Sequence, residues 1–358
     1  MVHQHYVGEH EVFLVQPVHI GATWTHETMH FRSLVVDKEG EVVSASFKKF
    51  FNWDEKPELT PAPKSLEGAS LMEKLDGSTL IFSRYKGHTV VRTRGTVDAR
   101  KQENGHEIDV LLEKYSKFKE ILESVETTDI SYIFEWMSPL NRIVLNYGDE
   151  ADMALVGVIF HKDYTMVTQN GLDVLAVQMQ LRRPRSFKYD SVADMKAAIE
   201  ALRDQEGLCV YYNIDQNIGK VKSAHYLFLH RAKSEISSIE KVVDVYIDWF
   251  ITKRFVEHSE VSYTAFFAYL TEKFDFEIAT MARGHASNIC DAMKEVEKIM
   301  NALFEYAAKC KALPRKDAAI KILQAYGSTG RSSIIFKILD GKVVGSDDWK
   351  KILYQVLK

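Results

Sequence analysis

The organisation of the chain follows from one stretch, Leu71-Met72-Glu73-Lys74-Leu75-Asp76-Gly77-Ser78-Thr79-Leu80-Ile81-Phe82. Lys74 stands where an apolar, β-prone run begins, and Gly77 allows the backbone to approach a ligand closely. A lysine amine attacks phosphorus only when it is deprotonated, so we expect neighbouring cations or partial burial to lower the pKa of Lys74. A surface lysine before a turn and a hairpin strand is the alternative interpretation, because Lys-x-Asp-Gly alone is common.

Composition indicates a globular chain with room for two domains. The 358 residues are 46% hydrophobic and 27% charged, which are ordinary globular values. The net charge of -4 argues against binding nucleic acid by bulk charge, while leaving room for a local basic face. The odd number of cysteines without a CxxC motif predicts a reducing compartment and neither a disulfide framework nor a zinc site: Cys209, Cys290 and Cys310.

The N-terminus has no apolar signal region, and the chain has no apolar run of about 18 residues. We therefore expect a cytoplasmic protein without a membrane partner. His3, His5 and His10 could bind a metal adventitiously, although a solvated N-terminal segment is the favoured interpretation.

The first part of the chain predicts short strands, with hairpin turns at 38–40 and 86–87. Helical spacing of apolar residues predicts helices over 107–125 and 191–203. Strands are predicted over 11–15, 31–37, 41–47, 78–85, 88–93, 131–137, 153–160, 208–212 and 218–223.

Beyond about residue 230 the apolar period changes from 2 to 3.6, which predicts a separate all-helical domain. The sequence thus predicts an α+β protein, with a β-rich domain over 1–232 and an all-α domain over 233–358. Helices are expected over 239–255 and 289–307, and near 263–273, 315–325, 329–339 and 346–357.

Two predicted strands carry charges inside apolar runs. Glu135 needs a partner there, which could be a cation, a sugar hydroxyl or a metal. Lys220 and Lys222 point to one face of their strand, so they repel each other unless an anion lies between them. A solvated edge strand is the alternative. Together with Lys74 and the acid Glu206, these groups fit the attack of a lysine on a nucleoside triphosphate.

Two cations are followed by three aromatic residues within four positions upstream, in Lys48-Lys49-Phe50-Phe51-Asn52-Trp53. This segment is either a base-stacking and phosphate-contact element or an edge strand that buries its rings. Arg94 beside Gly95 also suits a phosphate, with a surface turn as the alternative.

Four short motifs occur in the order and spacing of the covalent nucleotidyltransferases, which include ATP-dependent ligases and mRNA capping enzymes. These are Lys74–Gly77, Phe134–Trp136, Glu206–Leu208 and Lys220–Ser223. Over residues 30–232 the chain most resembles the phage-type RNA ligase 1 family. The segment Pro139-Leu140-Asn141-Arg142-Ile143-Val144-Leu145, the stretch Lys49–Asn52, and Lys222-Ser223 leading to Tyr226 carry that resemblance.

The resemblance implies a nucleotidyltransferase domain with ATP-grasp-like antiparallel sheets, and Lys74 as the residue that becomes linked to AMP. Lys220 and Lys222 would contact the α-phosphate as catalytic groups, and the family carries a lysine where this chain has Arg94. Mg²⁺, for which Mn²⁺ can substitute, would be held by Glu206, Glu135 and Asp76. Nucleotide-binding roles fall on Arg32, Lys49, Phe51, Glu73, Asp76, Gly77, Arg94, Glu135, Glu206, Lys220 and Lys222.

The implied activity is the joining of 5′-phosphate and 3′-hydroxyl ends of single-stranded RNA through lysyl-AMP and RNA-adenylate. The implied partners are ATP and RNA ends, such as a nicked tRNA anticodon loop, in a monomer acting in the cytoplasm of a cell or a phage-infected host. The alternatives are an RNA ligase of another family, a DNA ligase, or an RNA-end-binding protein without turnover. Helices after residue 230 argue against a DNA ligase or capping enzyme, which would carry a β-rich OB domain there.

Overall fold

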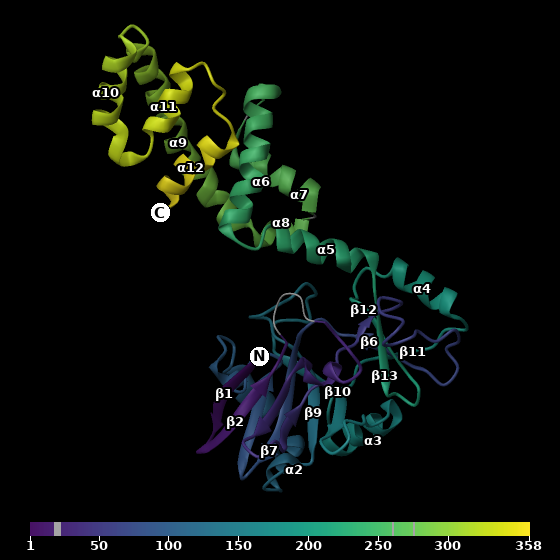
Figure 1. The fold of residues 1–358 in the computed structure, drawn as a ribbon. Helices are drawn as coiled ribbons and strands as arrows, with labels where there is room; N and C mark the ends of the chain where they lie inside the picture. Colours follow the sequence, from purple (N-terminus) through teal and green to yellow (C-terminus); the bar gives the residue numbers. More distant parts are fainter. Residues whose placement is uncertain (18–22, 260, 275) are drawn as a thin grey trace. The chain divides into compact units, whose positions relative to one another are not determined.

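The computed structural model describes residues 1–17, 23–259, 261–274 and 276–358 (Figure 1). The chain divides into two compact units, Met1–Phe228 and Leu229–Lys358. The first unit combines largely antiparallel sheets with helices, and the second is helical, so the predicted α+β class is confirmed. The expected functional division between 1–232 and 233–358 stays a prediction.

The first sheet is antiparallel, in the order β1-β2-β3-β4. The N-terminal segment expected to be solvated is a mostly exposed strand. The strand predicted over 31–37 begins only at Leu34, because a 3-10 helix, η1 (Thr28–Arg32), precedes it. The hairpin turn expected at 38–40 is confirmed; Asp37 Oδ1 accepts hydrogen bonds from the amides of Glu39 and Glu41. The strands are β1 (Val2–Val7), β2 (His10–Val15), β3 (Leu34–Asp37) and β4 (Val42–Ala45).

The second sheet has the order β10-β9-β7-β8. Its β7–β8 hairpin turns at Lys86-Gly87, as predicted, with φ of 47° and 79° at the two positions. Positive φ at both central residues is the type I′ geometry that matches the twist of the flanking strands. The strands are β7 (Ser78–Tyr85), β8 (His88–Thr93), β9 (Ile130–Met137) and β10 (Asp152–Phe160).

The third sheet has the order β11-β6-β12-β13-β5, with β13 and β5 parallel. The predicted return of the chain from the strand after Glu206 into the strand of the paired lysines is confirmed, because β12 and β13 pair antiparallel. The strands are β5 (Phe51–Asn52), β6 (Ser70–Lys74), β11 (Ser186–Phe187), β12 (Gly207–Tyr212) and β13 (Asn217–Lys222).

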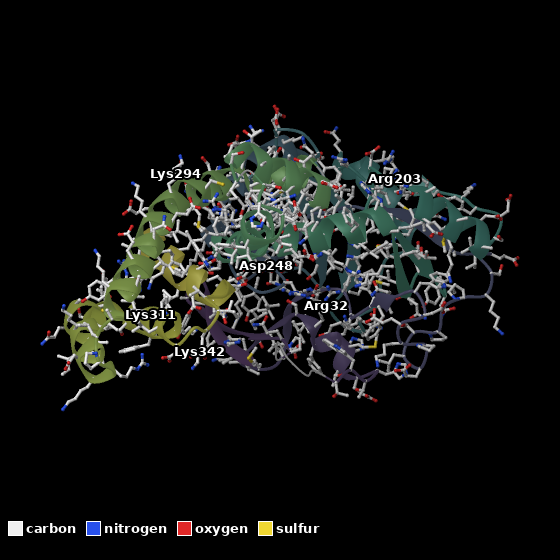
Figure 2. The ribbon with its side chains drawn as sticks, turned by 90° about the horizontal axis from the view of Figure 1, so that it is seen from above. Arg32, Arg203, Asp248, Lys294, Lys311 and Lys342 are labelled. Atoms are coloured by element: carbon white, nitrogen blue, oxygen red, sulfur yellow. The ribbon has the colours of Figure 1, made fainter. Side chains whose placement is uncertain are left out.

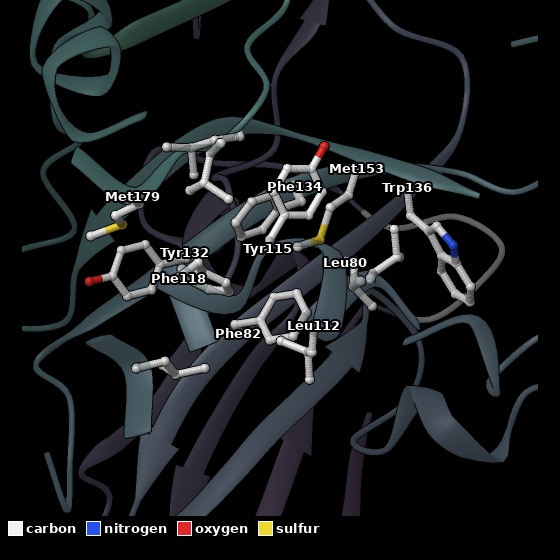
Figure 3. Close-up of a cluster of buried hydrophobic side chains, with 14 of the residues drawn as sticks. Leu80, Phe82, Leu112, Tyr115, Phe118, Tyr132, Phe134, Trp136, Met153 and Met179 are labelled. Atoms are coloured by element: carbon white, nitrogen blue, oxygen red, sulfur yellow. The ribbon is translucent and has the colours of Figure 1, made fainter. Parts of the chain in front are cut away.

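A large apolar cluster lies between the second sheet and helices of the first unit (Figure 3). The helix predicted over 107–125 is two helices, because Tyr115 leaves helical geometry with φ of -105° and ψ of 49°. Sequence reasoning missed α3, whose first turn is capped by Thr168. The helices are η2 (Ala99–Lys101), α1 (Glu107–Lys114), α2 (Ser116–Glu123), α3 (Gln169–Met179), α4 (Val192–Ala201) and α5 (Ala224–Glu235), the last reaching into the second unit.

Arg92 of β8 is fully buried and connects the first two sheets. Its guanidinium donates to the side chains of Ser33 and Ser44 and to the carbonyls of both residues. Burial lowers the pKa of Arg92 to about 9. The hydrogen bonds to neutral acceptors compensate part of the cost of burying this charge.

The second unit is built around α9 (Arg283–Cys310), whose buried positions recur at helical spacing through Ile289, Met293, Val296, Met300 and Leu303, as predicted. Trp349 packs on Phe250 with ring centroids 5.1 Å apart. The other helices are α6 (Ile239–Ile251), the π-helical η3 (Thr252–Val256), α7 (Tyr263–Phe274), α8 (Phe276–Met281), α10 (Arg315–Tyr326), η4 (Gly327–Thr329), α11 (Ser332–Leu339) and α12 (Ser346–Leu357).

Lysines such as Lys294 and Lys311 point outward from the second unit (Figure 2). The thiols of Cys209, Cys290 and Cys310 are free. Among the described residues, every helix is too short or too polar to cross a membrane.

Candidate active site

Three neighbouring strands, β6, β12 and β13, bring Lys74, Glu206 and Lys222 together, with Glu206 directly before β12. In the sheet, Gly207 pairs with Lys74 on one side and with Lys222 on the other. Glu206 is 2% exposed, and its two carboxylate oxygens form ion pairs of 2.8 Å, Oε2 with Lys74 Nζ and Oε1 with Lys222 Nζ. Gly207 makes this closeness possible, since its φ is 148° and a Cβ there would lie 1.9 Å from the carbonyl oxygen of Val221.

The ion pair reverses the expected behaviour of Lys74. Burial lowers the pKa of Lys74, but the negative charges of Glu206 and Glu135 outweigh burial and raise it above the ordinary lysine value. The expectation of a lowered pKa is therefore wrong for this structure. To act as a nucleophile, Lys74 would first have to lose its proton and change its contact with Glu206.

Glu135 lies on β9 opposite Thr79 of β7, and its Oε1 accepts a hydrogen bond of 3.0 Å from the amide of Gly77. Burial raises the pKa of Glu135 to about 7, against the lowering effect of the Lys74 charge. A Cβ on Gly77 would lie 2.3 Å from the carbonyl oxygen of Trp136. Gly77 therefore brings the Lys74 segment directly against the strand that carries Glu135.

Asp76 connects the lysine motif with two later segments. Its Oδ2 accepts hydrogen bonds from the amides of Val144 and Leu145 at 2.7 and 2.8 Å, and its Oδ1 accepts one from Tyr226 Oη at 2.7 Å. Its own amide donates to Tyr147 Oη at 2.9 Å. Asp76 is 4% exposed, and its carboxylate already accepts hydrogen bonds from three donors. This arrangement supports a positioning role and gives no support to Asp76 as a metal ligand.

The predicted cations form one electrostatic group. Burial and the charges of Lys49 and Arg32 lower the pKa of Lys220 to about 8. Burial, with the charge of Arg94, likewise lowers the pKa of Arg32 to about 10, and burial lowers the pKa of Lys49. Since mutual repulsion among partly buried cations costs free energy, an anion bound between them would be stabilised.

A cavity of about 280 Å³ opens beside Lys74. Its lining combines the site's charges with an apolar wall that includes Met72, Val156 and Tyr211. Predicted residues that line it are Arg32, Glu73, Lys74, Gly77, Arg94, Glu135, Lys220 and Lys222. A second cavity of about 350 Å³ shares Arg32, Gly77, Thr79 and Arg94 with the first and adds Ser78, Thr93, Gly95, Gln102, Asn104, Trp136 and Asn141.

Two predicted nucleotide-binding residues, Phe51 and Glu73, already make contacts within the protein. Phe51 is 2% exposed, with Lys49 Nζ 4.9 Å from its ring centre, so its ring is part of the interior. The Glu73 carboxylate accepts two hydrogen bonds from the Arg185 guanidinium, at 2.8 and 2.9 Å, although Glu73 lines the cavity.

Sequence reasoning missed Phe50 as a cavity residue. Phe50 is part of the cavity lining, and its ring centre lies 5.1 Å from Arg32 Cζ and 5.5 Å from Lys220 Nζ. It also missed Cys209 and Tyr211, for which period-two alternation along β12 was an available signal.

The comparisons with known proteins address the same part of the chain. A family model described as RNA ligase matches residues 30–236. The chain belongs to the RNA ligase family. The match confirms the resemblance drawn from the four motifs. The matched range includes each of the cavity residues named above.

Individual relatives of this RNA ligase family member are distant. An RNA ligase of Rhodothermus phage RM378 is 26% identical over 271 residues, covering 59% of this chain and 61% of its own length. A Thermovibrio ammonificans protein, named an RNA ligase only provisionally, is 28% identical over 212 residues, covering 58% and 53%. A Naegleria gruberi RNA ligase solved with ATP and Mn is 14% identical, with a TM-score of 0.41 over 59% of this chain and 64% of that one. The chain thus spans less than two thirds of these relatives.

Proposed function

We propose that the protein is an ATP-dependent RNA ligase that works through a lysyl-AMP intermediate on Lys74. The observation that carries this proposal is that Lys74 lines one cavity together with Arg32, Arg94, Lys220 and Lys222. A lysine beside four cations suits a polyphosphate substrate, and the family match supplies the class of enzyme.

The proposed first step forms a bond between Lys74 Nζ and the α-phosphorus of ATP and breaks the bond to pyrophosphate. Lys74 must lose a proton, and Glu206 Oε2, 2.8 Å from Nζ, is placed to accept it. Lys220 and Lys222 would stabilise the charge on the α-phosphate oxygens, with Arg32 toward the departing phosphates. Positioning and electrostatics would supply most of the rate acceleration.

Carboxylate oxygens of Glu135 and Glu206 are the donor type that Mg²⁺ or Mn²⁺ prefers, so the residues fit such an ion. When bound, it would neutralise phosphate oxygens of the nucleotide. Both oxygens of Glu206 are ion-paired with lysines, so a cation at Glu206 would compete with Lys74 and Lys222.

The second cavity supports RNA ends as the acceptor. It adjoins the first through Arg32 and Arg94 and continues into neutral hydrogen-bonding side chains, including Gln102, Asn104 and Asn141. Such a lining suits a terminal phosphate followed by ribose and base. AMP would pass to the 5′-phosphate, and the 3′-hydroxyl of the other end would then displace AMP.

We place the adenylyltransferase function in residues 1–232 and propose that the helical residues 233–358 select the RNA. Repair of a nicked tRNA anticodon loop by a monomer in the cytoplasm is the physiological setting that we propose.

The test is incubation with α-labelled ATP and Mg²⁺ without RNA, followed by a denaturing gel. The wild type should carry label, Lys74→Ala should carry none, and the matched control Lys64→Ala, at an exposed lysine, should equal the wild type. An unlabelled wild type that also lacks the added mass of AMP before treatment would refute the proposal and favour an RNA-end-binding protein.

A second assay identifies the nucleic acid. Labelled wild-type protein is given 5′-phosphorylated single-stranded RNA or DNA of the same sequence. Transfer of AMP to RNA and joining of its ends is the expected result. Transfer to DNA alone would refute the RNA ligase assignment while leaving the lysyl-AMP step in place.

A further inference from the structure

Three side chains with metal-binding atoms meet at the tips of two hairpins in the first unit. The β1–β2 hairpin turns at Gly8-Glu9, with Val7 paired to His10, and the β7–β8 hairpin turns at Lys86-Gly87, with Tyr85 paired to His88. Each histidine is the first residue of its strand. Two-residue turns fix the direction of the strands that leave them, so both imidazoles start from well-defined backbone positions.

The two hairpins are held together by packing. Val7 and Tyr85, which directly precede the two turns, belong to one buried apolar cluster, and His10 packs edge-on against Tyr85 with ring centroids 5.8 Å apart. Gly8 has a φ of 57°, and a Cβ there would lie 2.4 Å from His88 Nε2. The imidazole of His88 can therefore lie over the first turn only because residue 8 has no side chain.

The distances in this cluster are close to those of a metal site. His10 Nε2 lies 3.6 Å from Glu9 Oε1, and His88 Nε2 lies 3.6 Å from Glu9 Oε2. One ligand atom from each residue can be chosen so that all three lie within 4.8 Å of one another. Two ligands of a tetrahedral Zn²⁺ at about 2.1 Å are roughly 3.4 Å apart, so small side-chain movements would complete three-ligand coordination.

We propose that Glu9, His10 and His88 bind a transition-metal dication of the Zn²⁺ type, with water as the fourth ligand. Two imidazoles and one carboxylate form a donor set that suits Zn²⁺ far better than Mg²⁺, which takes oxygen ligands. The side chains are 78%, 27% and 42% exposed, in that order, so the ion can enter from solvent. The bound cation cross-links the first sheet, through His10, to the second sheet, through His88, and thereby stabilises the first unit.

This site is independent of the proposed ligase function. Its residues are distinct from the linings of both cavities beside Lys74. Of the three N-terminal histidines considered as adventitious ligands, His10 joins this cluster, whereas His3 lies on β1 opposite Leu14. His3 therefore offers a matched control on the same hairpin.

The experiment titrates the chelator-treated full chain with Zn²⁺ by calorimetry, in excess Mg²⁺ to occupy oxygen-rich sites. The wild type and His3→Ala should bind one more Zn²⁺ per chain than His88→Ala. Glu9→Gln should bind that Zn²⁺ at least about tenfold more weakly, because an amide oxygen is a poorer ligand than a carboxylate. Co²⁺ should give the visible absorption of a histidine-bound ion in the wild type and His3→Ala, and should not give it in His88→Ala.

Thermal unfolding with and without Zn²⁺ provides the second readout. Zn²⁺ should raise the midpoint of the wild type and leave that of His88→Ala unchanged, because only a ligand bound to the folded state stabilises it. The Zn²⁺-free midpoints of the variants report whether they fold. Equal Zn²⁺ binding by the wild type, His88→Ala and Glu9→Gln would overturn the proposal, as would a loss caused equally by His3→Ala.

Discussion

Removal of one hydroxyl group, in Tyr226→Phe, should weaken the first unit and slow the chemistry at Lys74. Tyr226 is 2% exposed, and its Oη donates a hydrogen bond of 2.7 Å to Asp76 Oδ1. Hydrogen bonds to charged groups contribute about 1.5–3 kcal/mol. Phenylalanine has the same aromatic ring, so the substitution retains the contact with Lys222 Nζ, which lies 5.0 Å from the ring centre. We therefore expect a loss of about 1.5–3 kcal/mol, or at least about 3 °C in the unfolding midpoint.

The assay is urea unfolding of the full chain followed by circular dichroism, in a double-mutant cycle with Asp76→Asn. An asparagine at 76 can keep its carbonyl on the amides of Val144 and Leu145 and turn its amino group to Tyr226 Oη. The charge is then gone, so Tyr226→Phe should cost less than about 1.5 kcal/mol in that background. Tyr6→Phe, at an exposed ring, is the control and should change nothing.

Two results would refute this reasoning. One is a cost of Tyr226→Phe below about 0.5 kcal/mol in the wild-type background, the size of an ordinary surface substitution. The other is an equal cost with Asp or Asn at position 76, which would show that the hydroxyl contributes independently of the negative charge of Asp76. A parallel labelling assay should show slower lysyl-AMP formation by Tyr226→Phe, since Asp76 is two residues from Lys74.

Three further predictions concern the same site. Gly77→Ala places a methyl group 2.3 Å from Trp136 O, so it should lower the free energy of unfolding in urea by about 1–3 kcal/mol and slow the labelling of the protein by α-labelled ATP. Gly95→Ala, where a methyl group would meet open space, should do neither. Equal behaviour of the two variants would contradict the steric argument. Because the pKa of Lys220 is about 8, its positive charge is lost as the pH rises through 8, so the KM for ATP in pyrophosphate exchange should rise there in the wild type but stay flat in Lys220→Arg. The pKa of Glu135 is raised to about 7 from an ordinary 4.5, so between these pH values the folded state holds a proton that the unfolded state has lost, and the free energy of unfolding falls as the pH rises. The free energy of unfolding of Glu135→Gln in urea should therefore match that of the wild type below pH 4.5 and exceed it above pH 7. A difference between the two proteins that stays constant across this range would contradict the assignment.

Strand alternation and hairpin chemistry were strong enough in the sequence to predict much of the first unit. The turn at Lys86-Gly87 and the antiparallel return of β13 beside β12 follow from residues close together in the chain. The break at Tyr115 could not be read in this way, because the apolar spacing continues across it and only the backbone angles change.

The site shows the same division between local and distant information. The residue types at Lys74, Glu135, Glu206 and the paired lysines indicated phosphate chemistry. The raised pKa of Lys74 depends on an ion pair across 132 positions of sequence, which no local pattern reports. Phe50 and Phe51 are adjacent aromatic residues, and neighbouring side chains of a strand point to opposite faces. Alternation alone therefore could not tell which of the two rings lines the cavity and which lies in the interior.

The ion pair of Lys74 with Glu206 also determines what the amine does while no substrate is present. A protonated amine has no lone pair to offer, so cyanate, aldehydes and activated acyl groups, which modify neutral lysines, find little to react with at Lys74. The proposed nucleophile is thereby protected from accidental acylation. A covalent inhibitor aimed at this lysine would need a cationic group that takes over the carboxylate of Glu206 before its electrophile could react.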